Sequence, residues 1–305
     1  MLPYIARRLI GALVVIVLAG TVVFGILQIA GDPASLLLSS GGSQDDLARM
    51  RAELGLDQPL PVRYGRFLLG VVTLDMGNSY RYGEPAFGLV LERLPATLVL
   101  ALAALAIAVV IGVPLGVVAA ANEDSIADIA SSFFAFLGQA APNFWLGAMF
   151  ILLFSVQLGW LPTSGAGSPW HLVLPAMTLA LRPLAQLTRL TRSEVIETLG
   201  QEYVRTAHAK GLGPRAVLRR HVLRNAAIPI VTLIGLDLGA LLGGAIVIES
   251  VFAWPGSGRL LLQAIEHRDF PVLQAGVVVL ASIVVLINLA VDLLYTWLNP
   301  RVRLS

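Results

Sequence analysis

The chain of 305 residues has no cysteine, a single lysine and few charges of either sign. Without cysteine it can form neither a disulfide nor a thiolate metal site. Charged residues make up 13% of the chain, whereas an average soluble domain has roughly 25%. So little polar surface cannot cover a soluble globule, and the mean hydropathy of +0.81 predicts an integral membrane protein. The net charge of +2 gives no indication of nucleic-acid binding.

Several catalytic motifs are also missing. The one lysine, Lys210, is followed by Gly211 and Leu212, so no G-x-x-x-x-G-K-[ST] phosphate loop can be built around it. The chain therefore cannot hydrolyse ATP by P-loop chemistry. Its four histidines are scattered and form no H-E-x-x-H pair, and no G-x-S-x-G occurs. A metal site is not expected, and an intramembrane hydrolase is the weakest functional class.

Long apolar runs are abundant. A membrane-spanning helix needs about 20 mostly apolar residues, and six segments meet this description, which predicts an all-α protein with six transmembrane helices. The segments are Leu9–Ala30, Leu94–Ala121, Ile126–Val156, Leu172–Leu190, Ala226–Glu249 and Val272–Leu298. The fourth is the weakest because Arg182 and Pro183 interrupt it. The first is too long for a signal-peptide core and lacks an A-x-A cleavage site, so we interpret it as an uncleaved anchor.

The distribution of basic residues predicts the orientation. With a cytoplasmic N-terminus, the cytoplasmic side receives Arg7, Arg8, the basic residues between Arg182 and Arg224, and the C-terminal Arg301 and Arg303. This arrangement obeys the positive-inside rule, since the long first outer loop is exempt from it. Both termini are therefore expected in the cytoplasm. The short loop "NEDS" fits this orientation poorly, but acidic residues count for little in the rule.

The first outer loop is expected to be a small folded cap. Ser43 with Asp46 three residues later predicts a helix start, and Gly55 suits its C-terminal end. Pro59 and Pro61 are expected to end the segment.

Six basic residues gather between Glu202 and Pro229: Arg205, Lys210, Arg215, Arg219, Arg220 and Arg224. The apolar spacing around them is helical, and Gly211, Gly213 and Pro214 break it, which predicts two short helices joined by a tight turn. By composition alone, such a stretch most simply supplies positive-inside charge that contacts lipid headgroups. The alternative is a cytoplasmic docking element.

The amino-acid sequence of this stretch decides between the two interpretations. "YVRTAHAKGL" followed by "LRNAAIP" resembles the EAA-type coupling loop of ABC-importer permeases, in the form of the dipeptide/oligopeptide (nickel) branch. Further segments resemble the same family in the same order: "AGDPA", "ELGLDQPLPVRY", "PNFWLG", "GWLPTSG", "ESVFAWPGSGRLLLQAI" and "DLLYTWLNPRVR". Together they cover nearly the whole chain. His208 departs from the pattern, because arginine is usual at its position.

The resemblance implies the fold of a type I ABC importer permease in a bacterial inner membrane. It implies four domains: an anchor helix (1–30), an outer loop with short helices (31–93), a five-helix core (94–298) containing the cytoplasmic coupling loop (191–225), and a cytoplasmic tail (299–305). The implied partners are a second homologous permease, two ATPase subunits that carry ATP and magnesium, and an extracytoplasmic substrate-binding protein. No cofactor is expected on this chain.

The resemblance also assigns residues. The implied ATPase-coupling residues are Glu202, Tyr203, Arg205, Thr206, Ala207, Lys210, Gly211, Leu212 and Arg220. The turn after the fifth span is implied to contact the binding protein through Trp254, Pro255, Gly256 and Gly258.

Two features of the predicted spans suggest the translocation path. Gly235, Gly239 and Gly243 lie four apart, a spacing that lets helices approach closely, and the expected neighbour is the second permease. Arg182 and Asp237 fall at similar depths, where a charge costs at least ~2.5–3.5 kcal/mol and should not face lipid. They either line the path or form a structural ion pair.

Two questions stay open at this point. A proton-coupled secondary transporter that uses Asp237 or Asp292 is the alternative mechanism. Within the resembling family, di- and oligopeptides are the majority substrates, and nickel complexes, glutathione and haem-like compounds are alternatives.

Overall fold

The structure is a computed structural model that describes residues 2–29, 31–34, 43–123, 125–126, 128–129 and 138–298. Within these residues the regular structure is helical, apart from one isolated bridge between Asn78 and Pro85. The predicted all-α class is confirmed. The predicted tail (299–305), Ala30 at the end of the first span and most of residues 127–137 in the third span lie outside the described residues.

The chain forms two compact units, each made of two separate stretches. The first comprises Met1–Thr97 and Pro255–Leu286, and the second comprises Leu98–Trp254 and Ile287–Ser305. Two long helices, which begin at Ala86 and at Phe270, each contribute residues to both units.

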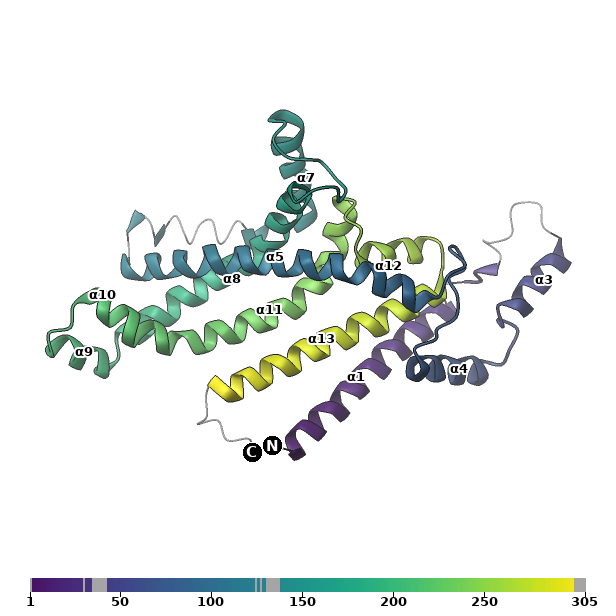
Figure 1. The fold of residues 1–305 in the computed structure, drawn as a ribbon, viewed down its shortest axis with the longest axis horizontal. Helices are drawn as coiled ribbons and strands as arrows, with labels where there is room; N and C mark the ends of the chain where they lie inside the picture. Colours follow the sequence, from purple (N-terminus) through teal and green to yellow (C-terminus); the bar gives the residue numbers. More distant parts are fainter. Residues whose placement is uncertain are drawn as a thin grey trace. The chain divides into compact units, whose positions relative to one another are not determined.

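The first unit contains helices from the N-terminal and the C-terminal parts of the chain (Figure 1). Its elements are α1 (Leu2–Ile29), α3 (Gln44–Glu53), α4 (Leu60–Thr73), the start of α5 (Ala86–Ala121), α12 (Ser257–Glu266) and the start of α13 (Phe270–Leu298). Apolar side chains of α1, α5, α12 and α13 share one core. Its fully buried members include Val90 and Val272.

The helix predicted after Ser43 is present. Ser43 caps α3, its hydroxyl accepts from the Asp46 N–H, and the Asp46 carboxylate accepts from Ser43 in return. These hydrogen bonds hold the pKa of Asp46 below its usual value and complete a capping box. Gly55 follows the helix with φ of +65°, a conformation that glycine adopts freely.

The sequence interpretation missed a helix after this segment. The first helix ends at Glu53, and Pro59 and Pro61 then open a further helix, α4. Proline is well tolerated in a first helical turn, since the N–H that it lacks has no partner there. If the residues that follow are not considered, these two prolines therefore suggest only the end of a helical segment.

The second unit is built around α8. It contains the rest of α5, α7 (Asn143–Phe150), the π-helical η1 (Ile151–Gln157), α8 (Trp170–Leu199), α9 (Glu202–Ala209), α10 (Pro214–Val217), the π-helical η2 (Leu218–Val222) and α11 (Leu223–Val251). Two glycines let α5 lie against the α8 backbone. A Cβ at Gly112 would stand 2.9 Å from the Leu184 carbonyl oxygen, and one at Gly116 would stand 2.6 Å from the Thr191 Cβ. Small residues four apart are typical of such close helix crossings.

Four helices of the described residues are long and apolar enough to cross a membrane: Ile10–Ile29, Ala86–Ala121, Pro214–Val251 and Phe270–Asp292. They correspond to the first, second, fifth and sixth predicted spans. The second helix begins at Ala86, eight residues before the predicted start of the span at Leu94.

The third and fourth predicted spans differ from the expectation. Pro142 precedes α7, so Ile126–Val156 is not one uninterrupted helix; proline lacks the N–H that continues a helix and restricts the residue before it. The fourth, expected over Leu172–Leu190, is a helix of 30 residues that runs to Leu199 and includes Pro175 and Pro183. Its length suffices for a span, but its polar residues distinguish it from the four apolar helices.

Candidate functional site: the turn between α9 and α10

The predicted helix–turn–helix is present, and its geometry explains Gly211. After α9, Lys210 is the last residue near helical geometry and Gly211 takes φ of +82°. The Gly211 N–H donates to the His208 carbonyl at 2.9 Å, and the Leu212 N–H donates to the Ala207 carbonyl at 3.3 Å. This pair of bonds is a Schellman motif, which favours glycine at the left-handed position.

The second helix of the pair is longer than predicted. Gly213 precedes α10 in extended geometry, and Pro214 opens the helix. Helical structure then continues from Pro214 to Val251. The element after the turn is therefore not a separate short helix but the beginning of the fifth span, so the turn is directly continuous with a span.

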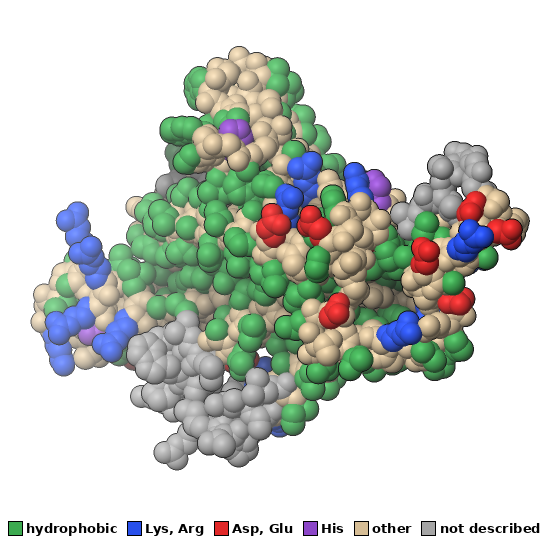
Figure 2. Space-filling model, turned by 45° about the vertical axis from the view of Figure 1, so that its right-hand side comes forward, with side chains coloured by type: hydrophobic (Ala, Val, Ile, Leu, Met, Phe, Trp, Pro, Cys, Tyr) green, Lys and Arg blue, Asp and Glu red, His purple; other side chains and the backbone are tan. Residues whose placement is uncertain are grey.

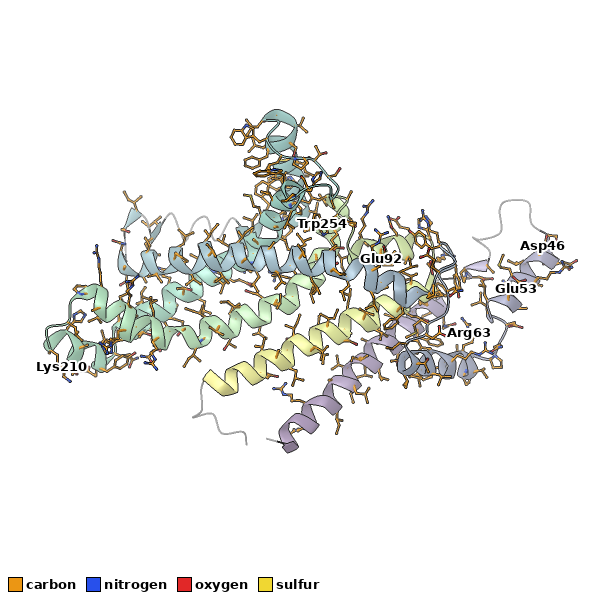
Figure 3. All side chains as sticks on the ribbon, viewed as in Figure 1. Asp46, Glu53, Arg63, Glu92, Lys210 and Trp254 are labelled. Carbon is orange, nitrogen blue, oxygen red and sulfur yellow. The ribbon has the colours of Figure 1, made fainter. Side chains whose placement is uncertain are left out.

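The turn presents a surface of exposed basic side chains, which we call the basic surface. All six predicted members are exposed: Arg205, Lys210, Arg215, Arg219, Arg220 and Arg224. Figure 2 shows Lys and Arg side chains gathered at this end of the second unit, and Figure 3 places Lys210 at the tip of the turn. Only Arg205 has an ion pair within the described chain, with Glu202 at 2.9 Å. Such an exposed pair contributes little stability, so the surface is available to a partner.

The opposite face of α9 packs inside the chain. Val204 and Ala207 are buried, and the Tyr203 hydroxyl accepts a hydrogen bond of 3.0 Å from the Asn225 side chain in α11. Ala207 therefore supports the turn from within rather than lying on its exposed side. These contacts tie α9 to the start of α11.

The sequence interpretation missed an ion pair on α8, the helix that precedes α9. The Arg192 guanidinium of α8 donates to both carboxylate oxygens of Asp128, at 2.6 and 2.7 Å. The Asp128 side chain is only 6% exposed, so the bidentate pair is largely shielded from water and fixes one geometry. Because 64 residues separate the partners, no local pattern could have indicated it.

Comparison with known proteins identifies the family. Residues 112–304 match the family described as "Binding-protein-dependent transport system inner membrane component", and residues 1–101 match the N-terminal part of the same membrane component. The chain belongs to this family of transport permeases. The permease thus works within an ABC transporter that also requires a binding protein and ATPase subunits, and it is not the ATPase itself.

Relatives match over the whole length of the permease. The dipeptide transport system permease protein DppB of Alkalihalophilus pseudofirmus is 39% identical over 99% of this chain and 100% of its own. A putative peptide transport system permease protein of Brucella abortus is 42% identical over 99% of both chains. The glutathione transport system permease protein GsiC of Salmonella paratyphi A is 40% identical, again over 99% of both.

A solved structure supports the fold. A chain of the MetNI methionine ABC transporter matches 69% of the permease and 96% of its own length, with a TM-score of 0.58 and 20% identity. At this identity the match shows a shared ABC-importer permease fold.

The turn predicted to contact the binding protein is mostly buried. In the turn between α11 and α12 (Figure 3), Trp254 and Gly256 are buried in this chain and Pro255 is partly exposed. Gly258, in the first turn of α12, is also buried. The turn is also anchored within the first unit, since the Ser257 N–H donates to the Thr97 hydroxyl at 2.9 Å. Of the four predicted residues, Pro255 is thus the one whose side chain a partner can reach.

Arg182 and Asp237 line one cavity of the second unit. Its volume is about 170 Å³, and Asn143 and Gln186 also line it. Asp237 is 7% exposed, and its Oδ2 has no hydrogen-bond partner among the described residues. No ion pair within 4.0 Å joins it to Arg182 in the described part of the chain. The predicted shared polar cavity is present, and its two charges are not in direct contact.

The glycines of the predicted stripe in α11 have different surroundings. A Cβ at Gly235 would overlap the Val291 side chain of α13, so this glycine packs within the permease. Gly243 is exposed, with no atom within 4 Å of an added Cβ, and Gly239 is partly exposed. Only these last two are available to a partner.

Proposed function

We propose that the permease pairs with a second homologous permease to form the path of an ATP-driven importer for di- and oligopeptides. The observation that carries the proposal is the exposed turn at Lys210 and Gly211, which is continuous with the fifth span. Relatives named as dipeptide and peptide transport permeases match the full chain, which supports the substrate class.

The turn is suited to transmit movement of the ATPases. Its outer face is basic and exposed, and a complementary acidic groove would bind it through charge-assisted contacts. Its inner face is packed on the chain, so a displacement of the turn must displace the start of α11. Coupling through Glu202–Arg220 is therefore a rigid-body motion of an element that belongs to a span.

The remaining topology is part of the proposal. Six spans with both termini in the cytoplasm place the basic surface on the ATPase side, and α1 would pack against the second permease. The α11–α12 turn would meet the binding protein on the other side. Labelling of a single cysteine introduced at the exposed Asn78 from outside the cell tests this orientation.

Transport by the reconstituted system tests the function. We expect uptake of a dipeptide into proteoliposomes only when the second permease, the ATPases, the binding protein and ATP are all present, with inhibition by vanadate. Uptake driven by a proton gradient without ATP would instead support the secondary-transporter alternative.

In the same reconstituted system, Pro255→Ala should weaken the stimulation of ATPase activity by loaded binding protein while leaving basal ATPase activity unchanged.

Glutathione is the second candidate substrate. A relative named as a glutathione permease is as similar to this chain as the peptide permeases are. Glutathione is itself a tripeptide, and its uptake is measured in the same assay. Uptake of glutathione with no uptake of ordinary dipeptides would replace the peptide proposal, and nickel and haem-like compounds are tested in the same way.

The exposed part of the glycine stripe predicts where the second permease packs. Replacing Gly243 with leucine should lower co-purification of the second permease several-fold, because the side chain would occupy a surface that needs close approach. Gly243→Ala adds one methyl group and should assemble nearly normally. Gly235→Leu should instead reduce the yield of the permease itself, since it overlaps Val291. Full assembly of Gly243→Leu would remove the stripe from the interface.

A further inference from the structure

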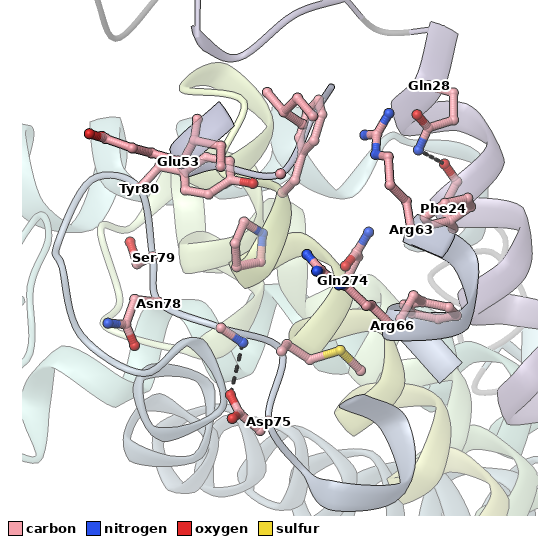
Figure 4. A pocket seen from close by; sticks show the side chains of 18 of the residues that line it. Phe24, Gln28, Glu53, Arg63, Arg66, Asp75, Asn78, Ser79, Tyr80 and Gln274 are labelled. Atoms are coloured by element: carbon pink, nitrogen blue, oxygen red, sulfur yellow. Dashed lines mark hydrogen bonds between the residues drawn. The ribbon is translucent and has the colours of Figure 1, made fainter. Parts of the chain in front are cut away.

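The first unit contains a large cavity on its outer segment. Its volume is about 910 Å³, which lies in the range of about 300–1,000 Å³ typical of small-molecule sites. The ends of α1 and α3, one face of α4, the loop after α4 and the start of α13 line it. Figure 4 shows these lining side chains from close by.

Two arginines of α4, Arg63 and Arg66, reach this cavity without a partner. Neither has a hydrogen bond or an ion pair within the described chain, and in Figure 4 no dashed line reaches either guanidinium group. By contrast, Arg51 of the same outer segment pairs with Asp32 at 2.5 Å. Arg63 is half-buried, and leaving such a cation unpaired is unfavourable. Two free guanidinium groups on one helix face suit an anion, and a carboxylate in particular.

Aromatic side chains line part of the cavity. Phe24 and Phe67 lie with ring centroids 5.6 Å apart, and Phe270 joins them in the lining. Tyr80 adds a hydroxyl group. Burial, and next the charge of Asp269, raise the pKa of Tyr80 to about 12, against the opposing effect of Arg63. The phenol therefore stays protonated and can donate a hydrogen bond.

The cavity also has two carboxylates in its lining. One oxygen of Asp75 is engaged, because its Oδ1 accepts from the Gly77 N–H at 3.0 Å. Glu53, at the end of α3, is exposed and has neither a hydrogen bond nor an ion pair of its side chain within the described residues. The lining thus combines two arginines without an ion pair, two carboxylates and several aromatic side chains.

We propose that this cavity binds a short peptide directly, with the peptide carboxylate on Arg63 and Arg66 and its amino group near Glu53. The peptide identity rests on the proposed function, but the match in charge is independent of it. A zwitterionic peptide would contact both the arginines and Glu53. A fatty acid or an anionic phospholipid has no cationic group for Glu53. The permease would then have its own affinity for substrate, separate from that of the binding protein.

The test measures binding to the assembled transporter in nanodiscs without the binding protein. The probes are the tripeptide alanyl-phenylalanyl-alanine, its C-terminal amide and its N-acetyl derivative. We expect the amide to bind about tenfold more weakly than the free tripeptide, as the loss of a charged hydrogen-bond partner implies. The double variant Arg63→Gln/Arg66→Gln should bind the free tripeptide and the amide equally weakly. The Glu53→Gln variant should bind the free tripeptide and its N-acetyl derivative with equal affinity.

Arg49→Gln is the matched control, because Arg49 is an exposed arginine of the same segment outside the cavity; it should bind like the wild type. Equal binding of tripeptide and amide to the wild type, or unchanged binding by the double variant, would overturn the inference. So would an anionic phospholipid that co-purifies with the wild type and not with the double variant, with no peptide binding.

Reconstituted uptake separates this inference from the proposed function. Peptide uptake without cavity binding overturns only the cavity assignment. Binding that depends on both arginines without peptide uptake overturns only the proposed transport function.

Discussion

Replacing Gly211 with aspartate should abolish transport while the permease still inserts into the membrane. Gly211 has φ of +82°, and a residue other than glycine costs about 1–2 kcal/mol in this region. This strain is too small to unfold a domain. It is enough to displace the Schellman turn, and the new carboxylate would also stand among the exposed cations of the basic surface. The measurements are vanadate-sensitive uptake and substrate-stimulated ATPase activity, with the amount in the membrane fraction as the check on insertion.

Gly213→Asp is the matched control for this variant. It introduces the same charge two residues further on, at φ of −68° and with no atom within 4 Å of an added Cβ. Aspartate is also favourable at this helix N-cap position, so Gly213→Asp should retain most of the transport. Gly211→Asn should fall between the two, because asparagine tolerates left-handed geometry better than most residues. Normal stimulated ATPase activity in Gly211→Asp would refute the coupling assignment.

The second large effect is expected at Asp237. We propose that Asp237 and Arg182 line the translocation path and meet the charged ends of a passing peptide. Asp237→Asn should then be inserted normally and should lower uptake of peptides with a free amino end by about tenfold, since a charge-assisted contact of about 1.5–3 kcal/mol is lost. Uptake of N-acetylated peptides should change little. Arg182→Gln should show the converse selectivity, for the carboxyl end.

The double variant separates this proposal from a structural ion pair. Breaking a buried pair by removing one partner leaves an uncompensated charge and is destabilising by about 3–5 kcal/mol. A structural pair would therefore give poor expression of both single variants and recovery in Arg182→Gln/Asp237→Asn. Equal losses of uptake for free and blocked peptides, or recovery in the double variant, would contradict the assignment of these residues to the path. The separation of the two charges in the structure supports the path.

Local backbone chemistry explains which elements could be predicted. The box at Ser43 and Asp46, the glycine after α3 and the turn at Gly211 each depend on residues within a few positions of one another. The α4 helix was missed because proline opens a helix as readily as it ends one, and the outcome depends on whether the residues after the proline can form a helix. The interruption at Pro142 was underestimated for a related reason, since a long apolar run favoured one continuous span.

Contacts between distant segments could not be predicted in this way. The glycine spacing in α11 suggested close packing correctly, but Gly235 meets α13 of the same chain and only Gly239 and Gly243 stay available. The pair of glycines that lets α5 lie against the α8 backbone, Gly112 and Gly116, was not recognised. Spacing shows that a helix face is small, whereas the identity of the neighbour depends on how the whole chain folds.

Consecutive residues are enough to establish the membrane class, four apolar spans, the family and the position of the turn at Gly211, because hydropathy, glycine geometry and motif order are all local properties. Which residues are accessible and which charges are paired depends instead on the folded chain. Folding buries Trp254 and Ala207, joins Asp128 to Arg192 across 64 residues, and leaves Arg63 and Arg66 unpaired at one cavity within the described residues. Burial and pairing depend on side chains that come together from distant parts of the chain, and no local pattern specifies them.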